Sequence, residues 1–217
     1  PRMMIPSDQV PSGFFDRPLD FSKSLYVAHM LEWSCNSQFS PGKLVTFLGS
    51  VGELESEIKG LLLSNGIDSS VIPENIVAHL NISSDEDWKI PKEEMTYRRD
   101  FRNEVIFTID PLTARDLDDA LHIKRIRDCD GSGTVGWEVG VHIADVSYFV
   151  KSNTELDRCA AERGNSVYLV DKVIPMLPRI LCEQLCSLNP GSDRLTISVV
   201  WKMDDEANIY EEWFGRS

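Results

Sequence analysis

The first part of the chain alternates short apolar runs with residues that break regular structure. Apolar, β-prone stretches at 25–31 and 43–48 predict strands, with Pro and Gly residues between them. From 53 to 65 the apolar side chains recur instead with helical spacing, and Asn65-Gly66 predicts the end of that helix. Residues 67–96 are polar and show neither period, so we expect a connector there.

From about residue 97 the pattern changes. A continuous apolar run at 105–109 predicts a buried strand, and strict alternation at 137–143 and 195–203 predicts two half-buried strands. Helices are expected at 152–163 and 180–188. The chain is therefore predicted to be an α+β protein with three parts. These are part of a small β-barrel at 1–56, a helix and connector at 57–96, and a second domain of mixed α/β character at 97–217.

Composition adds two constraints to this picture. With 217 residues, 42% hydrophobic and 26% charged, the chain is long and apolar enough to bury a core. Its formal net charge of -13 argues against partners that attract basic proteins, such as nucleic acids and membrane surfaces. The acidic excess leaves two interpretations, ordinary solubility or carboxylates gathered around cations. Five irregularly spaced cysteines indicate reduced thiols rather than disulfides or a zinc site.

The segment 107–120 carries the most informative chemistry. It holds Asp110, Asp116, Asp118 and Asp119, with Arg115 as its one basic residue. Carboxylates this close repel one another unless a cation is present, and all-oxygen ligands suit Mg²⁺ or Mn²⁺. Asp110 ends a predicted strand, so the following loop can fold back and bring the later three beside it. Such a group can hold two metals, the arrangement for in-line displacement at a phosphodiester.

Several alternatives share parts of this pattern. A solvated loop in an acidic protein explains the bare motif without any metal. The motif of one class of terpene cyclases belongs to helical proteins, and aspartyl phosphatases need their nucleophile directly at the strand end. A calcium loop starting at Asp128 is rejected, because Val139 stands where a bidentate Glu is required.

Asp110, five residues, and then Asp116-Leu-Asp-Asp119 strongly resemble the signature of the RNase II (RNB) family of 3′-to-5′ exoribonucleases. The resemblance covers about 97–217, and the residues of these motifs are most similar to those of the exosome-independent cytoplasmic branch. In this family a cold-shock-type OB barrel precedes the catalytic domain, which fits residues 1–56. Further matching motifs are Val141-His-Ile-Ala-Asp-Val146, Ala161-Glu-Arg-Gly-Asn-Ser-Val-Tyr-Leu169, Pro175-Met-Leu-Pro178 and Leu185-Cys-Ser-Leu188.

The resemblance implies a role for particular residues. Asp110 and Asp119 would bind Mg²⁺ directly, and Asp116 and Asp118 would complete the cluster and act in catalysis, with Asp118 the most sensitive position. Tyr168 would stack on the terminal nucleotide, although a buried strand tyrosine is the simpler alternative. Further candidates are less specific. Arg163 and Arg179 could contact phosphate, with surface ion pairs as the commoner alternative. Asp145 is expected to be a structural strand-end aspartate that accepts backbone N–H bonds, and His142 a structural histidine satisfied by hydrogen bonds.

The function implied is Mg²⁺-dependent, processive hydrolysis of single-stranded RNA from its 3′ end, releasing 5′-mononucleotides. RNAs with 3′ uridine tails and a cytoplasmic location, P-bodies included, follow from the branch. Neither a membrane nor an obligate protein partner is expected. The complete catalytic domain of the family is longer than this chain, so the alternative is a truncated, non-catalytic RNA-binding fragment. A metal phosphohydrolase for small molecules is a weaker third interpretation.

Overall fold

The computed structural model describes residues 2–82 and 88–217, and it divides the chain into two compact units, 1–70 and 71–217. Residues 83–87 of the predicted connector lie outside the described residues. Within the described residues, no helix is long and apolar enough to cross a membrane. All five cysteines are free thiols, as the sequence indicated.

The first unit is an open three-stranded sheet followed by a helix. Strand β2 (Ser24–Met30) pairs antiparallel with β3 (Ser40–Ser50), and β1 (Met3–Met4) pairs parallel with the other edge of β3. A 3-10 turn, η1 (Pro18–Phe21), precedes β2. Helix α1 (Leu54–Ser64) follows the predicted bounds closely. Of its predicted apolar stripe only Leu62 is buried, because one layer of sheet covers little of the helix.

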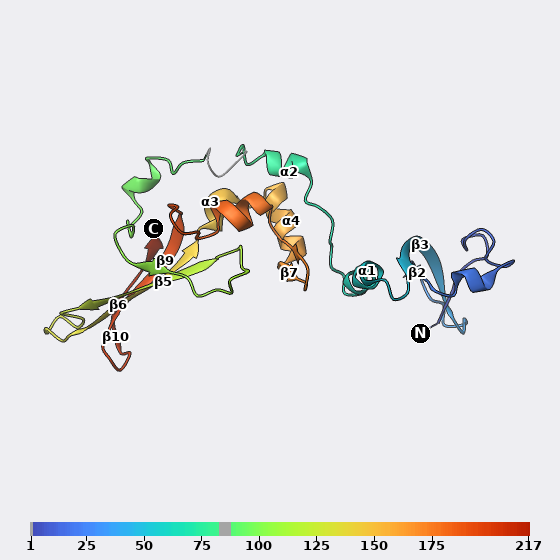
Figure 1. Ribbon diagram of the computed structural model, residues 1–217, viewed down its shortest axis with the longest axis horizontal. Helices are drawn as coiled ribbons and strands as arrows, with labels where there is room; N and C mark the ends of the chain where they lie inside the picture. Colours follow the sequence, from blue (N-terminus) through green and yellow to red (C-terminus); the bar gives the residue numbers. More distant parts are fainter. Residues whose placement is uncertain (1, 83–87) are drawn as a thin grey trace. The chain divides into compact units, whose positions relative to one another are not determined.

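The second unit is built on a five-stranded antiparallel sheet in the order β10-β9-β6-β5-β4 (Figure 1). These strands are β4 (Ile106–Phe107), β5 (Asp119–Ile126), β6 (Gly136–Ala144), β9 (Thr196–Met203) and β10 (Ile209–Arg216). Between β6 and β9 the chain forms α3 (Val146–Phe149), α4 (Glu155–Arg163), the hairpin β7 (Val167–Tyr168) and β8 (Val173–Ile174), and the π-helix η3 (Ile180–Leu185). Two short elements, α2 (Glu74–Ala78) and η2 (Glu94–Thr96), precede the sheet.

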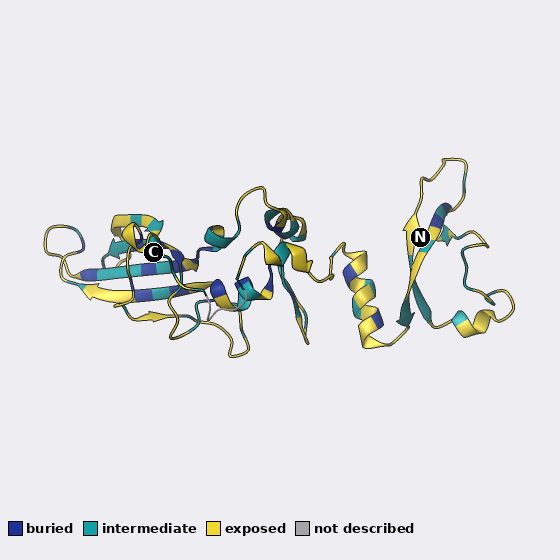
Figure 2. Ribbon diagram, turned by 90° about the horizontal axis from the view of Figure 1, so that it is seen from above, coloured by how far each residue is buried: buried dark blue, intermediate teal, exposed yellow. Residues whose placement is uncertain are grey.

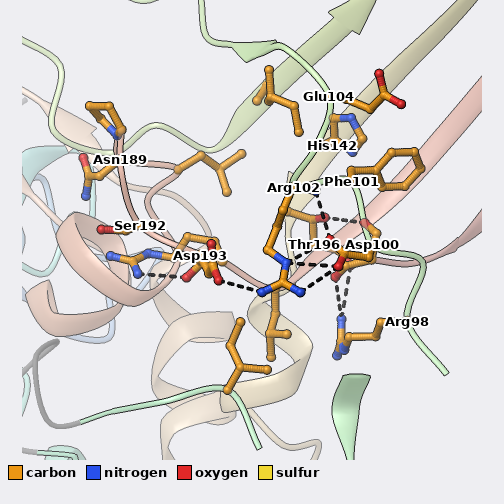
Figure 3. A pocket seen from close by; sticks show the side chains of 18 of the residues that line it. Arg98, Asp100, Phe101, Arg102, Glu104, His142, Asn189, Ser192, Asp193 and Thr196 are labelled. Carbon is orange, nitrogen blue, oxygen red and sulfur yellow. Dashed lines mark hydrogen bonds and ion pairs between the residues drawn. The ribbon is translucent and has the colours of Figure 1, made fainter. Parts of the chain in front are cut away.

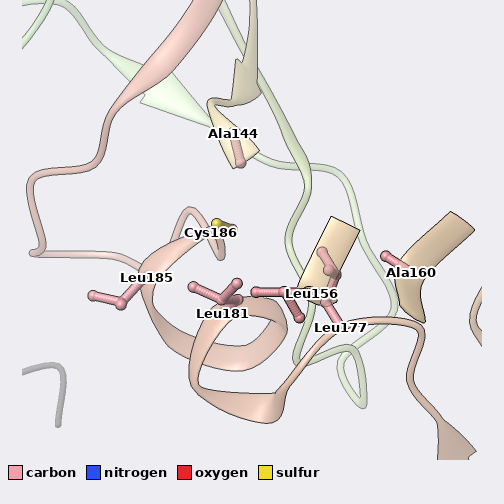
Figure 4. Packing of buried hydrophobic residues seen from close by; sticks show 7 residues of the cluster. All are labelled: Ala144, Leu156, Ala160, Leu177, Leu181, Leu185 and Cys186. Atoms are coloured by element: carbon pink, nitrogen blue, oxygen red, sulfur yellow. The ribbon is translucent and has the colours of Figure 1, made fainter. Parts of the chain in front are cut away.

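The hydrophobic core of this unit lies beside the end of β6 rather than over the middle of the sheet. Leu181 and Leu185 of η3 are 0% and 1% exposed, and they pack with side chains of α4 and with Ala144 (Figure 4). The remaining members of the cluster are Leu156, Ala160, Leu177 and Cys186. Helix α4 begins after Thr154, which accepts a hydrogen bond from the Asp157 amide, so it starts three residues later than the predicted 152. It ends at Arg163 as the sequence predicted, with Gly164 just past its end.

The sheet reverses the expectation about which strand faces are buried. The alternation at 137–143 predicts buried apolar side chains, yet in β6 the buried positions are Gly136, Gly140, His142 and Ala144 (Figure 2). Ile143 is 46% exposed, and in β9 Ser198 is buried whereas Ile197 is exposed. The cause is the segment around Arg98 and Phe101, which covers the small and polar face of the sheet. The apolar face is left without a comparable cover among the described residues.

The prediction of a buried strand at 105–109 is also wrong. Two residues of the run, Ile106 and Phe107, form the edge strand β4, and both are about two-fifths exposed. Val105 and Ile109 on either side are exposed as well. Side chains of a strand project to the two faces of the sheet, and at this edge the described residues cover neither face closely enough to bury them. Asp110 consequently lies three residues beyond the strand, in the loop that leads to β5.

A chain of hydrogen bonds runs across the buried polar face. His122 Nδ1 lies 2.8 Å from His142 Nε2, and His142 Nδ1 lies 2.7 Å from Ser198 Oγ, which links β5, β6 and β9. The chain needs a glycine at 140, because a Cβ there would overlap the His122 ring. His142 is thereby a satisfied structural residue, as the sequence suggested. Burial, followed by the charges of His122 and Arg99, lowers the pKa of His142 to about 4.

We predict that His142 makes folding sensitive to mild acid. Its pKa falls from 6.5 in the unfolded chain to about 4 in the folded protein, so the unfolded state binds the extra proton between these values. Stability is full above pH 6.5 and falls as the pH is lowered, by about 2 kcal/mol between pH 7 and pH 5 for this one group. Urea unfolding followed by tryptophan fluorescence at both pH values measures the loss.

The matched control is exposed His79. His142→Gln should remove most of the difference in unfolding free energy between pH 5 and pH 7, while His79→Gln should keep it. An equal pH dependence in the two variants would contradict the assignment of the loss to His142.

Candidate active site

The four aspartates flank the start of β5. Asp119 opens the strand, Asp116 and Asp118 stand just before it, and Asp110 lies upstream in the exposed loop after β4. All three neighbours act electrostatically on Asp118. Its pKa is raised above the ordinary value, first by partial burial and then by the charges of Asp116, Asp119 and Asp110. The structure therefore brings the four predicted carboxylates into one mutually repelling group.

The loop that carries these carboxylates is held by its backbone. The Ala144 amide donates to the Asp118 carbonyl at 3.0 Å, which continues the β5–β6 pairing by one residue. The Leu188 amide donates to the Leu117 carbonyl at 2.8 Å. The Ser187 hydroxyl adds two further bonds to residues 115 and 117. These bonds engage backbone groups of the loop and not its aspartate carboxylates.

Tyr168 lies beside this group. It closes the short strand β7, and its phenol donates a hydrogen bond to a carboxylate oxygen of Asp116. That bond, with burial and the nearby negative charges, raises the pKa of Tyr168 to about 12, so the phenol stays protonated at neutral pH. The residue is nevertheless 62% exposed. It is therefore not a buried strand tyrosine, and its ring remains open to a planar partner.

The two candidate arginines are both engaged with the protein. Arg163 donates to the Pro175 carbonyl at 2.9 Å, which ties the end of α4 to the chain after β8. Arg179 forms an ion pair with Glu183 one turn later. Both contacts are partly open to solvent. A contact of either residue with phosphate remains a prediction, and for Arg179 it would compete with Glu183.

Asp145 has a structural role, through partners that differ from the expected ones. Instead of backbone amides, its buried carboxylate accepts hydrogen bonds from Arg98 at 2.7 Å and from Ser147 at 2.6 Å. Burial alone would raise its pKa, but the bonds from Ser147 and Arg98 outweigh this effect and lower it. Arg98 also pairs with Glu94 and donates to the carbonyls of Thr196 and Ser217. This cluster locks the end of β6 to the start of β9 and to the residue after β10.

A cavity of about 560 Å³ lies next to this ion pair (Figure 3). Arg98 and Arg102 contribute to its wall, together with Phe101, His142 and Thr196. Arg102 is held by Asp100 at 2.7 Å and by Asp193 at 3.2 Å, so its charge is neutralised within the wall. None of the four aspartates of the carboxylate group lines the cavity. It is thus distinct from the site at the start of β5.

The donor set of the carboxylate group fits a hard divalent cation. It consists of oxygen ligands alone, and Asp118 is raised in pKa by like charges that a cation would neutralise. In the part of the chain that the structure describes, no three His, Cys, Asp or Glu side chains stand close enough to hold a metal ion. The carboxylates are thus gathered at electrostatic range but not drawn to ligand distance.

Sequence reasoning missed two residues near this group. Ser187 follows η3 and contacts the aspartate loop, and the one available signal was its place in the motif Leu185-Cys-Ser-Leu188, which assigned it no role. Cys182, on η3 itself, lies close enough to Asp116 and Asp118 for their charges to act on its thiol. Burial first, and then these charges, raise the pKa of its thiol.

Two family models match the chain. The RNB domain matches residues 98–217, and the Dis3-like cold-shock domain 2 matches residues 1–66. The chain is 55% identical over all its 217 residues to "DIS3-like exonuclease 2" of Caenorhabditis elegans. It spans 26% of the length of that relative.

Solved structures resemble the whole chain as well. RNase R of Mycoplasma genitalium in complex with ribose-methylated single-stranded RNA matches with a TM-score of 0.77 and 27% identity. The match covers 99% of this chain and 31% of that one. Yeast Ssd1, described as a pseudonuclease, matches with a TM-score of 0.80 and 28% identity, over 100% of this chain and 26% of that one. The same fold thus occurs with and without nuclease activity.

We predict that Asp118→Asn stabilises the metal-free protein. A carboxyl whose pKa is raised on folding destabilises the folded state at neutral pH, where it is ionised. Removing this charge should raise the free energy of unfolding in EDTA only slightly, because Asp118 is exposed and solvent screens its repulsion. Thermal unfolding of both proteins in EDTA and in Mg²⁺ measures the effect, and the variant should gain less stability from Mg²⁺ than the wild type.

Asp171→Asn is the control, because it removes one charge from an exposed loop. It should leave both the stability in EDTA and the gain from Mg²⁺ unchanged. A variant Asp118→Asn that is less stable than the wild type in EDTA would show that the aspartates do not repel one another in the folded protein.

Proposed function

Because this chain belongs to the RNB family, whose domain matches more than half of it, we propose that its parent protein is a hydrolytic 3′-to-5′ exoribonuclease. The enzyme acts processively on single-stranded RNA and releases 5′-mononucleotides. The observation that carries the proposal is the contact between Tyr168 and Asp116. It sets an exposed aromatic ring, which can stack on a base, beside a group of four carboxylates, which can support hydrolysis.

In the proposed reaction Asp110, Asp116, Asp118 and Asp119 hold two divalent cations, Mg²⁺ or Mn²⁺. Bound there, the cations supply a nucleophilic water and stabilise the leaving oxygen of the phosphodiester. The chain's own part is to gather the carboxylates against their mutual repulsion. Asp118, whose pKa is raised first by burial and then by the charges of its three neighbours, is the residue whose charge matters most for this balance.

Tyr168 has two tasks in this proposal. Its hydroxyl holds the Asp116 carboxylate, and its exposed ring face stacks on the 3′-terminal base. Stacking is worth roughly 1–3 kcal/mol per base and tolerates any base, which suits an enzyme that shortens one RNA step by step. Arg163 and Arg179 lie on neighbouring elements and are proposed to contact phosphates of the strand.

The substrates and location are proposed from the branch resemblance. RNAs with 3′ uridine tails would be preferred, the enzyme would act in the cytoplasm, P-bodies included, and no obligate protein partner would be required. Support for the RNA class comes from the RNase R structure in complex with single-stranded RNA. Fluorescence microscopy of the tagged parent tests the location, and a purely nuclear signal would overturn it.

The second candidate is a non-catalytic RNA-binding fragment of the same enzyme. Two observations favour it: the chain spans about a quarter of the relative's length, and no metal-binding group is formed among the described side chains. The likeness to the pseudonuclease Ssd1 supports it as well. Measuring RNA binding and RNA cleavage separately, for this chain and for the full-length parent, distinguishes the two candidates.

We predict a ladder of products from 5′-labelled single-stranded RNA incubated with the full-length parent and Mg²⁺. The RNA should shorten from its 3′ end, faster on a uridine-tailed RNA than on an adenine-tailed one. Asp118→Asn should abolish the ladder, because it removes a proposed metal ligand, while RNA binding in EDTA persists. Asp171→Asn should leave the ladder intact. Internal cuts, or activity that survives Asp118→Asn, would overturn the proposal.

We further predict that Tyr168→Ala weakens RNA binding by roughly 5- to 150-fold, which corresponds to the loss of one stacked base. Fluorescence anisotropy with the full-length Asp118→Asn parent in EDTA measures affinity without turnover. Tyr168→Phe keeps the ring and removes the hydroxyl, so its affinity should stay within about twofold of the Asp118→Asn background. Equal losses for Phe and Ala would assign the effect to the hydroxyl rather than to stacking.

A further inference from the structure

Ser187 is buried between the helical core and the aspartate loop. Its residue is 0% exposed, and it stands two positions after the end of η3. The hydroxyl accepts a hydrogen bond from the Leu117 amide at 3.0 Å and donates one to the Arg115 carbonyl at 2.9 Å. Seventy residues separate it from Leu117 along the chain. A single side chain thus forms hydrogen bonds to the backbone on both sides of Asp116.

Few side chains can make this pair of contacts. The task requires a group that donates and accepts at once through one atom, and a hydroxyl is the group that does so in little space. An alanine would leave the Leu117 amide and the Arg115 carbonyl without this partner. A cysteine would keep much of the shape but would bond weakly in both directions.

Ser187 is itself held firmly. The π-helix before it is anchored in the core through Leu181 and Leu185, and the Cys186 amide closes the helix by donating to the Leu181 carbonyl at 2.8 Å. The Arg194 Nε donates to the carbonyls of Gln184 and Ser187, at 2.9 and 3.1 Å. π-helical turns are rare and are frequently found at functional sites. Here the turn places the Ser187 hydroxyl against the aspartate loop.

The contact is made where position matters most for the carboxylates. Residues 116 and 118 flank Leu117, whose amide is bonded to Ser187 and whose carbonyl is bonded to the Leu188 amide. Because both polar groups of Leu117 are engaged, the peptide units on either side have fixed orientations. The directions in which Asp116 and Asp118 leave the backbone are fixed by the same bonds.

We propose that Ser187 is a positioning residue for the reaction, which sets the orientation of Asp116 and Asp118 without touching substrate or metal. This inference rests on the proposed function of the carboxylate group. Ser187→Ala leaves every carboxylate and the net charge in place, so binding of RNA in EDTA is unchanged. The affinity for divalent metal falls, because the ligands must be reordered on binding, and kcat falls with little change in KM for RNA.

The test uses the full-length parent and Mn²⁺ as the probe metal. Electron paramagnetic resonance of free Mn²⁺ gives the metal affinity independently of activity, and Ser187→Ala should weaken it about 10- to 100-fold. Ser192→Ala, an exposed serine five residues on, is the matched control and should bind Mn²⁺ like the wild type. Circular dichroism establishes that each variant is folded at the assay temperature. RNA affinity in EDTA should be equal in all of them.

The outcomes separate this inference from the proposed function. If the wild-type parent binds Mn²⁺ and degrades RNA while Ser187→Ala matches Ser192→Ala, the positioning role is overturned and the function stands. If the wild type binds no Mn²⁺ and leaves RNA intact, the proposed function fails and the positioning role fails with it. Should Ser187→Ala not fold, Ser187→Cys is measured in the same way, and wild-type Mn²⁺ affinity in that variant would overturn the role.

Discussion

Mutual repulsion among the aspartates at 110, 116, 118 and 119 is the constraint on which the rest of the second unit depends. Negative charges at this spacing would drive the loop apart if side-chain forces alone acted on it. Backbone bonds oppose that tendency: β6 holds the Asp118 carbonyl, and the chain after η3 holds Leu117. The sheet and the helical core therefore hold the acidic loop in place, and the loop carries the carboxylates of the proposed site.

The frame is itself fixed at the end of β6. The buried ion pair of Arg98 with Asp145 ties the start of α3 to the strand ends, while Ala144, one residue earlier, packs into the helical core. Buried ion pairs add little net stability compared with apolar packing, but losing one partner leaves an uncompensated charge. This pair, and the histidine chain across the sheet, therefore specify one register of the strands rather than simply strengthening them.

Much of this architecture follows from the sequence, and the exceptions have physical causes. The alternation at 137–143 and 195–203, the end of the helix at Arg163, and the run of aspartates were all readable from local patterns. The buried face of the sheet was not, because a glycine, a histidine and a serine become core residues only through the cross-strand bonds of His122, His142 and Ser198. Strand β5 was missed for a similar reason, since Lys124 and Arg125 make its second half resemble a loop.

The site shows the same division. Tyr168 and the aspartates could be proposed from the sequence because their residue types suit stacking and metal binding. Ser187 has an ordinary side chain, and its proposed role arises from a contact over seventy residues of sequence. No spacing rule could reveal it, because the contact depends on the π-helical turn that ends beside the loop. The sequence shows which chemical groups are present, but their relative orientation depends on the folded chain.

The π-helix has a consequence for how activity is lost over evolution. Its hydrogen bonds span five residues instead of four, so it accommodates one residue more than an α-helix of the same height. Substitutions that let the turn close as an α-helix with the same number of residues would rotate the serine by about 100° away from the loop. Such a descendant would keep all four aspartates and still have a misaligned site. The presence of the carboxylates is therefore not enough to tell nucleases from pseudonucleases on this fold. Whether the turn before Ser187 is π-helical or α-helical has to be considered as well.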